Sequence, residues 1–198
     1  MEKNLESLDT PNLSVSELLP RLSVTLRDAR GEDGEFLFQL FSSTREEELA
    51  AVPWTEEEKE VFLRMQFDAQ TRHYSAAFPH MDYKIILVDD NRAGRVLTTR
   101  LPGDLHVIDI AISPSCRNLG IGTMLIRKLK SDAERENLVL SLYVEVYNRA
   151  RILYERLGFV EVSTDNIYTR MEYRPGKILQ DEIHSESNMS RRETEITR

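Results

Sequence analysis

Hydrophobic and polar residues alternate along several short stretches of the chain, as they do in β-strands that bury one face. Turn-forming residues separate the middle stretches: Asp89-Asp90-Asn91 precedes one strand and Pro102-Gly103 precedes the next. The three middle strands are therefore expected to form an antiparallel meander. In all, the alternation predicts strands over residues 24–27, 83–88, 94–100, 105–112, 138–146, 159–162 and 167–173.

Apolar residues at helical spacing predict four helices between these strands. The second helix has the clearest start, because Thr55-x-x-Glu58 has the form of a capping box and Trp54 stands directly before it. The others lie around residues 36–41, after Gly120, and over residues 150–157. The resulting order is strand, two helices, three strands, helix, strand, helix and two strands, which indicates a mixed α+β domain.

Length and composition set the limits of this domain. With 198 residues and 40% hydrophobic residues, the chain has enough apolar content for one core of ordinary size. The first 20 residues and residues 175–198 are polar, so we expect a flexible N-terminal extension, a folded domain over residues 21–174 and a disordered C-terminal tail. The net charge of −8 argues against a nucleic-acid-binding protein, which would need a basic face.

Cysteine and histidine are too sparse to suggest a metal centre. Cys116 is the single cysteine, so neither an intramolecular disulfide nor a thiolate zinc cluster is expected, and the four histidines are scattered. The N-terminus carries Glu2 and Lys3 where a signal peptide would have a basic start and an apolar run, and no stretch approaches membrane-spanning length. We therefore expect a cytoplasmic protein without a metal or a membrane partner.

The most informative motif follows the strand at residues 105–112. Pro114 ends that strand, and Arg117-x-x-Gly120-x-Gly122 leads into a helix. Glycines allow the backbone to curl so that several N–H groups converge at the helix N-terminus, where partial positive charge favours a phosphate group. Arg117 adds a full positive charge. The loop is therefore a candidate pyrophosphate site.

A second motif runs from Asn148 to Phe159, with the pattern Asn-x-Ala…Leu-Tyr-x-x-x-Gly-Phe. The two motifs, in this order, resemble those of the GNAT superfamily of N-acetyltransferases, and the resemblance extends over residues 22–173. It departs in small details: Asn118 stands where a glycine is common, and Cys116 where an aromatic residue is common. The resemblance implies a mostly antiparallel mixed sheet of six or seven strands, flanked by four helices, with a splayed central pair of strands.

The resemblance also implies a function. Members of this superfamily move an acetyl group from acetyl-CoA directly to an amine, and the pantetheine arm lies between the two splayed strands. Carried onto this sequence, backbone groups of one strand and of the glycine loop would bind acetyl-CoA, with help from two side chains of the second motif. These residues are Ile110, Ala111, Ile112, Arg117, Asn118, Leu119, Gly120, Ile121, Gly122, Thr123, Asn148 and Tyr154.

Two residues are the candidates for proton transfer. The resemblance places the Tyr154 hydroxyl near the thioester sulfur, and a phenol with a reference pKa near ~10 is able to protonate a thiolate leaving group. Glu145 is the preferred general base, with Asp109 on the neighbouring strand as the alternative. Structural roles compete with each assignment: Tyr154 as a packing residue, Asn148 as a helix cap, and either carboxylate as a surface ion-pair partner.

Other interpretations stay open at this point. The run Glu46-Glu47-Glu48 either attracts a cationic amine or is a solvated helix face. A Rossmann dinucleotide site is disfavoured, because Leu125 occupies the place of its third glycine. A GNAT-like module that binds acyl-CoA without turnover is the remaining rival. For an enzyme, we expect a small-molecule amine as acceptor, and the hairpin over residues 159–173 is a candidate homodimer contact.

Overall fold

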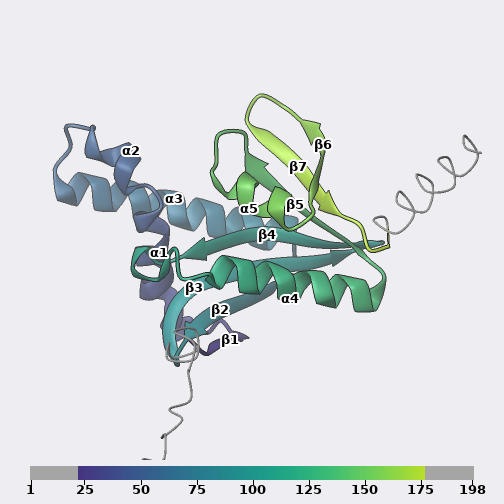
Figure 1. The fold of residues 1–198 in the computed structure, drawn as a ribbon. Helices are drawn as coiled ribbons and strands as arrows, with labels where there is room; N and C mark the ends of the chain where they lie inside the picture. Colours follow the sequence, from purple (N-terminus) through teal and green to yellow (C-terminus); the bar gives the residue numbers. More distant parts are fainter. Residues whose placement is uncertain (1–21, 177–198) are drawn as a thin grey trace, which may run out of the picture.

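The computed structural model describes residues 22–176, which form a single seven-stranded sheet with helices on both faces (Figure 1). The strands lie in the order β1-β2-β3-β4-β5-β7-β6. All neighbouring strands are antiparallel except β4 and β5. Their bounds are β1 Val24–Asp28, β2 Asp82–Val88, β3 Asn91–Leu101, β4 Asp104–Ile112, β5 Val139–Glu145, β6 Val160–Thr164 and β7 Tyr168–Tyr173.

The four predicted helices are present, together with one short helix that the pattern did not predict. The helices are α1 Gly34–Ser43, α2 Glu46–Ala50, α3 Glu56–Ala77, α4 Ile121–Glu136 and α5 Ala150–Arg156. The extra element, α2, contains five residues and buries none of them, so it leaves no apolar periodicity in the sequence. The predicted capping box is confirmed: the Thr55 side chain accepts from the Glu58 N–H, and Glu58 accepts from the Thr55 N–H.

Helix α4 and the sheet enclose the main core. Ile121, Leu125, Leu129 and Ala133 are buried at helical spacing, and they pack against strand residues such as Val107, Leu140 and Met171. Helices α1 and α3 lie across the opposite face of the sheet (Figure 1), where α1 buries Leu37, Phe38, Leu40 and Phe41. The predicted N-terminal extension and the part of the predicted C-terminal tail that follows Gly176 lie outside the described residues.

The central strands β4 and β5 separate part-way along their length, as the resemblance implied. Their parallel ladder joins residues 104–107 to residues 139–142 and then stops. At that point β4 carries a bulge at Ile108, because Val107 pairs with Thr98 while Asp109 pairs with Leu97. A bulge bends its strand and increases the local twist. Beyond it, β4 pairs only with β3 and β5 only with β7, which leaves one edge of each strand free.

The outer edge of the sheet is formed by β6, whose five residues are all exposed. Val160 and Val162 are about half exposed there, at 52% and 48%. A homodimer contact at this hairpin stays a prediction. Among residues 22–176, no helix has both the length and the apolar content needed to span a membrane.

Candidate active site

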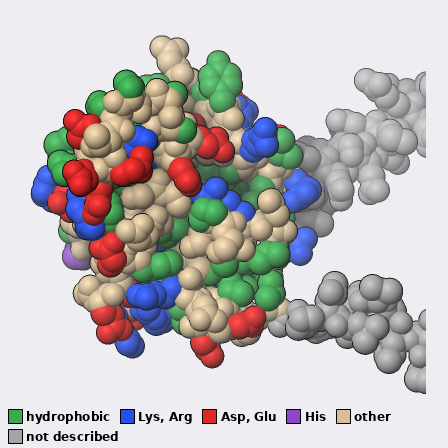
Figure 2. All heavy atoms as spheres, turned by 90° about the vertical axis from the view of Figure 1, so that its left-hand side faces the viewer, with side chains coloured by type: hydrophobic (Ala, Val, Ile, Leu, Met, Phe, Trp, Pro, Cys, Tyr) green, Lys and Arg blue, Asp and Glu red, His purple; other side chains and the backbone are tan. Residues whose placement is uncertain are grey.

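A cleft of about 540 Å³ opens where β4 and β5 separate. It is lined by residues from both splayed strands and from every helix except α4. Figure 2 shows the face formed by the α1 and α2 side of the molecule, which is hollowed near its centre and carries many acidic side chains. The separation of the two strands therefore opens a cleft at the place where the predicted site is expected.

One wall of the cleft is the free edge of β4. Ile110 and Ala111 line the cleft, while the side chains of Ile110 and Ile112 are partly buried against the main core. The backbone on this side of β4 has no strand partner, so its polar groups are available to an extended ligand arm. This geometry fits the backbone role that the resemblance assigned to residues 110–112.

The glycine loop adopts the curled backbone that its sequence predicts. Asn118 and Gly120 both have positive φ values, of 62° and 79°. Gly120 is the N-cap of α4, and no side chain caps the N–H groups of the first turn, which begins Ile121-Gly122-Thr123. Arg117 donates from Nε to the carbonyl oxygen of Ile112, at 3.1 Å, and thereby ties the loop to the end of β4. Leu119, between the two left-handed residues, is half exposed.

The N-terminus of α4 lies next to α5 and the end of β4. A Cβ placed on Gly122 would lie 3.5 Å from Leu153 Cδ2 and 3.7 Å from Ile112 Cδ1. Leu153 precedes Tyr154 on α5, and Tyr154 lines the cleft. The glycine loop and the predicted catalytic tyrosine therefore lie at the same end of the site.

Tyr154 is half-buried, and its ring packs against Phe159 with the ring centroids 5.7 Å apart. Burial, with a smaller contribution from the negative charge of Asp109, raises the pKa of Tyr154 to about 12. The hydroxyl is therefore a proton donor at neutral pH, and the ring is also a packing group. Both roles weighed from the sequence are compatible with this position.

Asn148 and Glu145 line the mouth of the cleft. The Asn148 side chain accepts a hydrogen bond from the Ala150 N–H at 2.9 Å, so it caps the turn that begins α5. Its amide N–H₂ group is still available to a ligand. Glu145 is exposed at the end of β5 and has no side-chain partner among residues 22–176.

Asp109, the alternative base, lies deeper, on β4 just past the bulge. Its Oδ2 atom accepts a hydrogen bond from Arg95 Nε at 2.7 Å, and 23% of its side chain is exposed. Arg95 also donates to Gln70 at 2.8 Å and to Tyr83 at 3.3 Å. This buried network links α3, β2, β3 and β4 beneath the cleft.

Sequence reasoning missed several residues that line the cleft. Arg95, Gln70 and the tyrosines Tyr74, Tyr143 and Tyr168 line the cleft. One signal was available: Arg95 is a charged residue inside an otherwise apolar strand segment, where an unpaired charge is costly. The tyrosines lack such a signal, because aromatic residues are common in strands and amphipathic helices.

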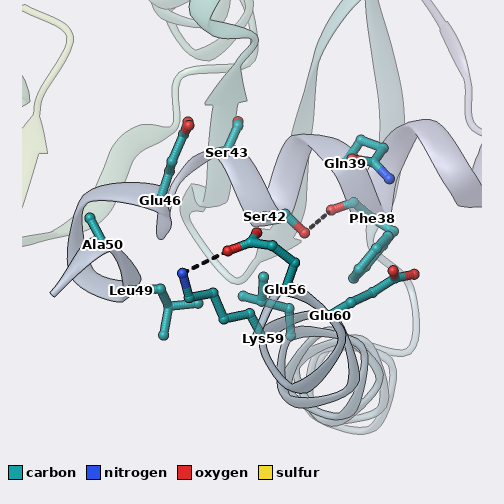
Figure 3. Close-up of a pocket in the computed structure, with 11 residues that line it drawn as sticks. Phe38, Gln39, Ser42, Ser43, Glu46, Leu49, Ala50, Glu56, Lys59 and Glu60 are labelled. Atoms are coloured by element: carbon teal, nitrogen blue, oxygen red, sulfur yellow. Dashed lines mark hydrogen bonds and ion pairs between the residues drawn. The ribbon is translucent and has the colours of Figure 1, made fainter. Parts of the chain in front are cut away.

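The acidic run at residues 46–48 divides between two cavities. Glu48 lines the cleft, whereas Glu46 lines a separate cavity of about 590 Å³ between α1, α2 and α3 (Figure 3). In that second cavity Lys59 forms an ion pair with Glu56 at 2.9 Å. Helix α2 therefore separates the two cavities, with Glu46 lining one and Glu48 the other. Of the two, only Glu48 lines the predicted site.

Comparison with known proteins agrees with this geometry. Residues 36–159 match the model of the acetyltransferase (GNAT) family, a span that contains the glycine loop, the splay and α5. The chain belongs to this family. A curated relative, an uncharacterised N-acetyltransferase of Methanocaldococcus jannaschii, is 29% identical over 102 residues, which are 52% of this chain and 58% of that protein. The match thus spans less than two thirds of the relative's length.

Solved structures of GNAT proteins share the fold. One is the PaiA N-acetyltransferase of Thermoplasma acidophilum in complex with coenzyme A, which is 18% identical, with a TM-score of 0.59 over 77% of this chain and 99% of that one. An acetyltransferase of Thermus thermophilus is 16% identical, with a TM-score of 0.57 over 77% and 97% of the two chains. At this level of identity the likeness concerns the fold alone.

Proposed function

We propose that this GNAT protein transfers an acetyl group from acetyl-CoA to a primary amine of a small-molecule acceptor. The observation that carries the proposal is that three features lie together: two of them line the cleft, and the N-terminus of α4 adjoins it at Ile112 and Leu153. These are the uncapped N-terminus of α4, the free edge of β4 and the half-buried Tyr154 hydroxyl. The pyrophosphate would bind the N–H groups of α4 and the Arg117 charge, and the pantetheine arm would pair with the β4 backbone. The PaiA structure with the same fold was solved in complex with coenzyme A, which supports coenzyme A as a ligand of this fold.

The chemistry is a direct transfer. The acceptor enters as an ammonium ion and gives one proton to a base. Its neutral nitrogen then attacks the thioester carbonyl carbon and loses a second proton to solvent as the C–S bond breaks and the thiolate leaves. Tyr154 donates its proton to the departing sulfur and is re-protonated from solvent. We assign Glu145 as the carboxylate that takes the amine proton, with Asp109 as the alternative within the same cleft. The net products are the acetylated amine, CoA thiol and one proton.

A panel of amines tests this proposal. CoA release from acetyl-CoA is followed with a thiol reagent, and thermal unfolding is measured with acetyl-CoA, CoA or NAD. Acetyl-CoA is expected to raise the melting temperature because it binds the native state alone, and NAD is expected to have no effect. A response to NAD without a response to millimolar acetyl-CoA contradicts the proposal. Binding of acetyl-CoA without turnover of any amine favours the non-catalytic acyl-CoA-binding module instead.

A further inference from the structure

The cleft contains a carboxylate, that of Asp109, whose ion pair with Arg95 uses only one of its two oxygens. Arg95 engages Oδ2 of Asp109, and no hydrogen bond from residues 22–176 reaches Oδ1. Arg95 itself is 4% exposed and is held by Gln70 and Tyr83 in addition to Asp109. The network therefore holds Asp109 through Oδ2, and the Oδ1 atom of this cleft-lining residue has no hydrogen bond from the described residues.

Aromatic rings surround this position. Phe41, Tyr74, Tyr143 and Tyr168 all line the cleft. Tyr143 and Tyr168 are 56% and 44% exposed, which is unusual for two large rings that face one cavity. Asp109, Tyr74 and Tyr168 therefore share one cleft, which they reach from β4, α3 and β7.

A carboxylate next to several aromatic faces is the chemistry that recognises an organic cation. The carboxylate accepts charge-assisted hydrogen bonds from an ammonium group, and aromatic faces attract the same positive charge. Among the described residues that line the cleft, Arg45 is the one cation outside the Arg95 network, and its guanidinium carbon lies 4.1 Å from the centroid of the Phe41 ring. Glu48, on the same wall, adds a further negative charge.

We propose that Asp109 Oδ1 receives the acceptor in its ammonium form, with Tyr74 and Tyr168 beside it, so that the cleft selects cationic amines over neutral or anionic molecules of the same shape. This inference rests on the proposed function, since it assigns the deeper half of the cleft to the acceptor. Asp109 is the specificity-determining residue, and Arg95 holds it in place. Glu145, at the rim, plays no part in this recognition.

The test compares two molecules that differ in charge alone. Binding of 2-phenylethylammonium and of 2-phenylethanol to the full-length protein is measured by ligand-observed NMR titration at pH 7. Each titration is done with CoA, which prevents turnover, and again without it. The wild-type protein is expected to bind the ammonium at least about ten-fold more tightly than the alcohol, in line with a charge-assisted hydrogen bond. Equal affinities overturn the proposal.

Three variants locate the preference. Asp109→Asn keeps the shape and one hydrogen-bond acceptor for Arg95, and it is expected to remove the ten-fold preference. Glu46→Gln is the matched control, because it removes the same charge from the neighbouring cavity on the other side of α2. Glu46→Gln and Glu145→Gln are both expected to retain the preference. Its survival in Asp109→Asn, or its loss in Glu145→Gln alone, contradicts the assignment.

A fourth variant, Tyr168→Leu, decides the question if Asp109→Asn fails to fold. Tyr168→Leu changes a side chain that is 44% exposed, and it is expected to lower the ratio of the two affinities about three-fold by removing one aromatic face. An unchanged ratio overturns the proposal. Binding of CoA itself is measured in parallel. If the protein selects the ammonium but does not bind CoA, the proposed acetyl transfer is refuted, whereas the proposed cation site is supported.

Discussion

Tyr154 and Phe159 pack their rings together at a centroid distance of 5.7 Å, across the turn that joins α5 to β6. This contact orients the tyrosine ring without using its hydroxyl, and no hydrogen bond from the other described residues engages that hydroxyl. The ring therefore has a packing role, and the hydroxyl is left for the proton transfer that we propose.

Tyr154→Phe separates these roles, because it removes one hydroxyl and retains the ring. Turnover is expected to fall on the order of 10²-fold, as general-acid assistance to the thiolate is lost. The melting temperature and the dissociation constant of acetyl-CoA are expected to change little. The measurement uses the best acceptor from the amine panel, under conditions where chemistry limits the rate. Equal turnover would make Tyr154 a packing residue, whereas a joint collapse of affinity and stability would make it an anchor.

The pH dependence of the wild-type enzyme follows from the same residue. Because the pKa of Tyr154 is raised to about 12, the hydroxyl stays protonated over the whole range from pH 6 to pH 10. No descending limb of kcat/KM from Tyr154 is therefore expected in that range, and any fall caused by loss of the ammonium form of the acceptor is expected to be the same in Tyr154→Phe. Steady-state rates at constant ionic strength provide the measurement, and the profile of Tyr154→Phe is the control. A descending limb near pH 9 that disappears in the variant would contradict the high pKa.

The parts of this site that are contiguous in sequence could be predicted, and the parts assembled from distant strands could not. Gly120, Gly122 and Tyr154 belong to two local motifs, and each motif carries its own helix start. Asp109 and Arg95 meet only because β3 and β4 pair around the bulge at Ile108, and no local pattern marks that bulge. The strands and long helices were predictable for the same reason: their periodicity is local.

Helix α2 and the aromatic residues of the cleft were harder to predict from the sequence, for a related reason. Five residues without a buried position give no amphipathic signal, so residues 46–50 read as a charged connection. Tyr74, near the end of α3, lines the cleft, and no sequence pattern marks it as a residue of the site. Which side chains face a cavity depends on the packing of the helix across the sheet, and a single sequence does not encode that angle locally.

Gly122→Asp tests the pyrophosphate site. A carboxylate at the second residue of α4 interacts favourably with the helix N-terminus, so the protein without ligand is expected to remain folded. The same carboxylate occupies and repels the place of the pyrophosphate, so CoA affinity is expected to fall by at least about 100-fold, a loss of about 3 kcal/mol. Isothermal titration calorimetry with acetyl-CoA measures the change.

The matched control for this change is Gly122→Ala. The added Cβ meets Leu153 and Ile112 at ordinary van der Waals distances, and alanine favours a helix over glycine. The alanine variant is expected to be as stable as the wild type or more stable, with a smaller loss of CoA affinity than the aspartate variant. Arg117→Ala is likewise expected to weaken binding less than Gly122→Asp. Wild-type affinity in Gly122→Asp would show that the loop is only a structural turn.

Asp33 provides a test of fold stability away from the cleft. It is fully buried before α1, and its carboxylate forms two hydrogen bonds of 2.7 Å with the guanidinium of Arg27 and a third, of 2.9 Å, with the Arg30 N–H. The hydrogen bonds from Arg27 hold the pKa of Asp33 well below its usual range. Asp33→Asn removes the charge that these donors favour, and it is expected to lower the free energy of unfolding by about 2 kcal/mol at pH 7.

The sign of the pH dependence provides a second check on the same pair. A carboxyl group whose pKa is depressed in the folded state stabilises the fold above its unfolded pKa, of about 4, and this contribution is lost as the pH falls towards the folded pKa. The gap in stability between the wild type and Asp33→Asn is therefore expected to be largest at pH 7 and to shrink below about pH 4. Urea unfolding at pH 7, 5 and 3 measures this gap.

Glu32→Gln is the matched control, since Glu32 is an exposed neighbour whose ion pair with Arg30, at 3.6 Å, is expected to contribute little. A gap that stays constant down to pH 3, or an equal loss in Glu32→Gln, would show that the Asp33 charge does not stabilise this turn.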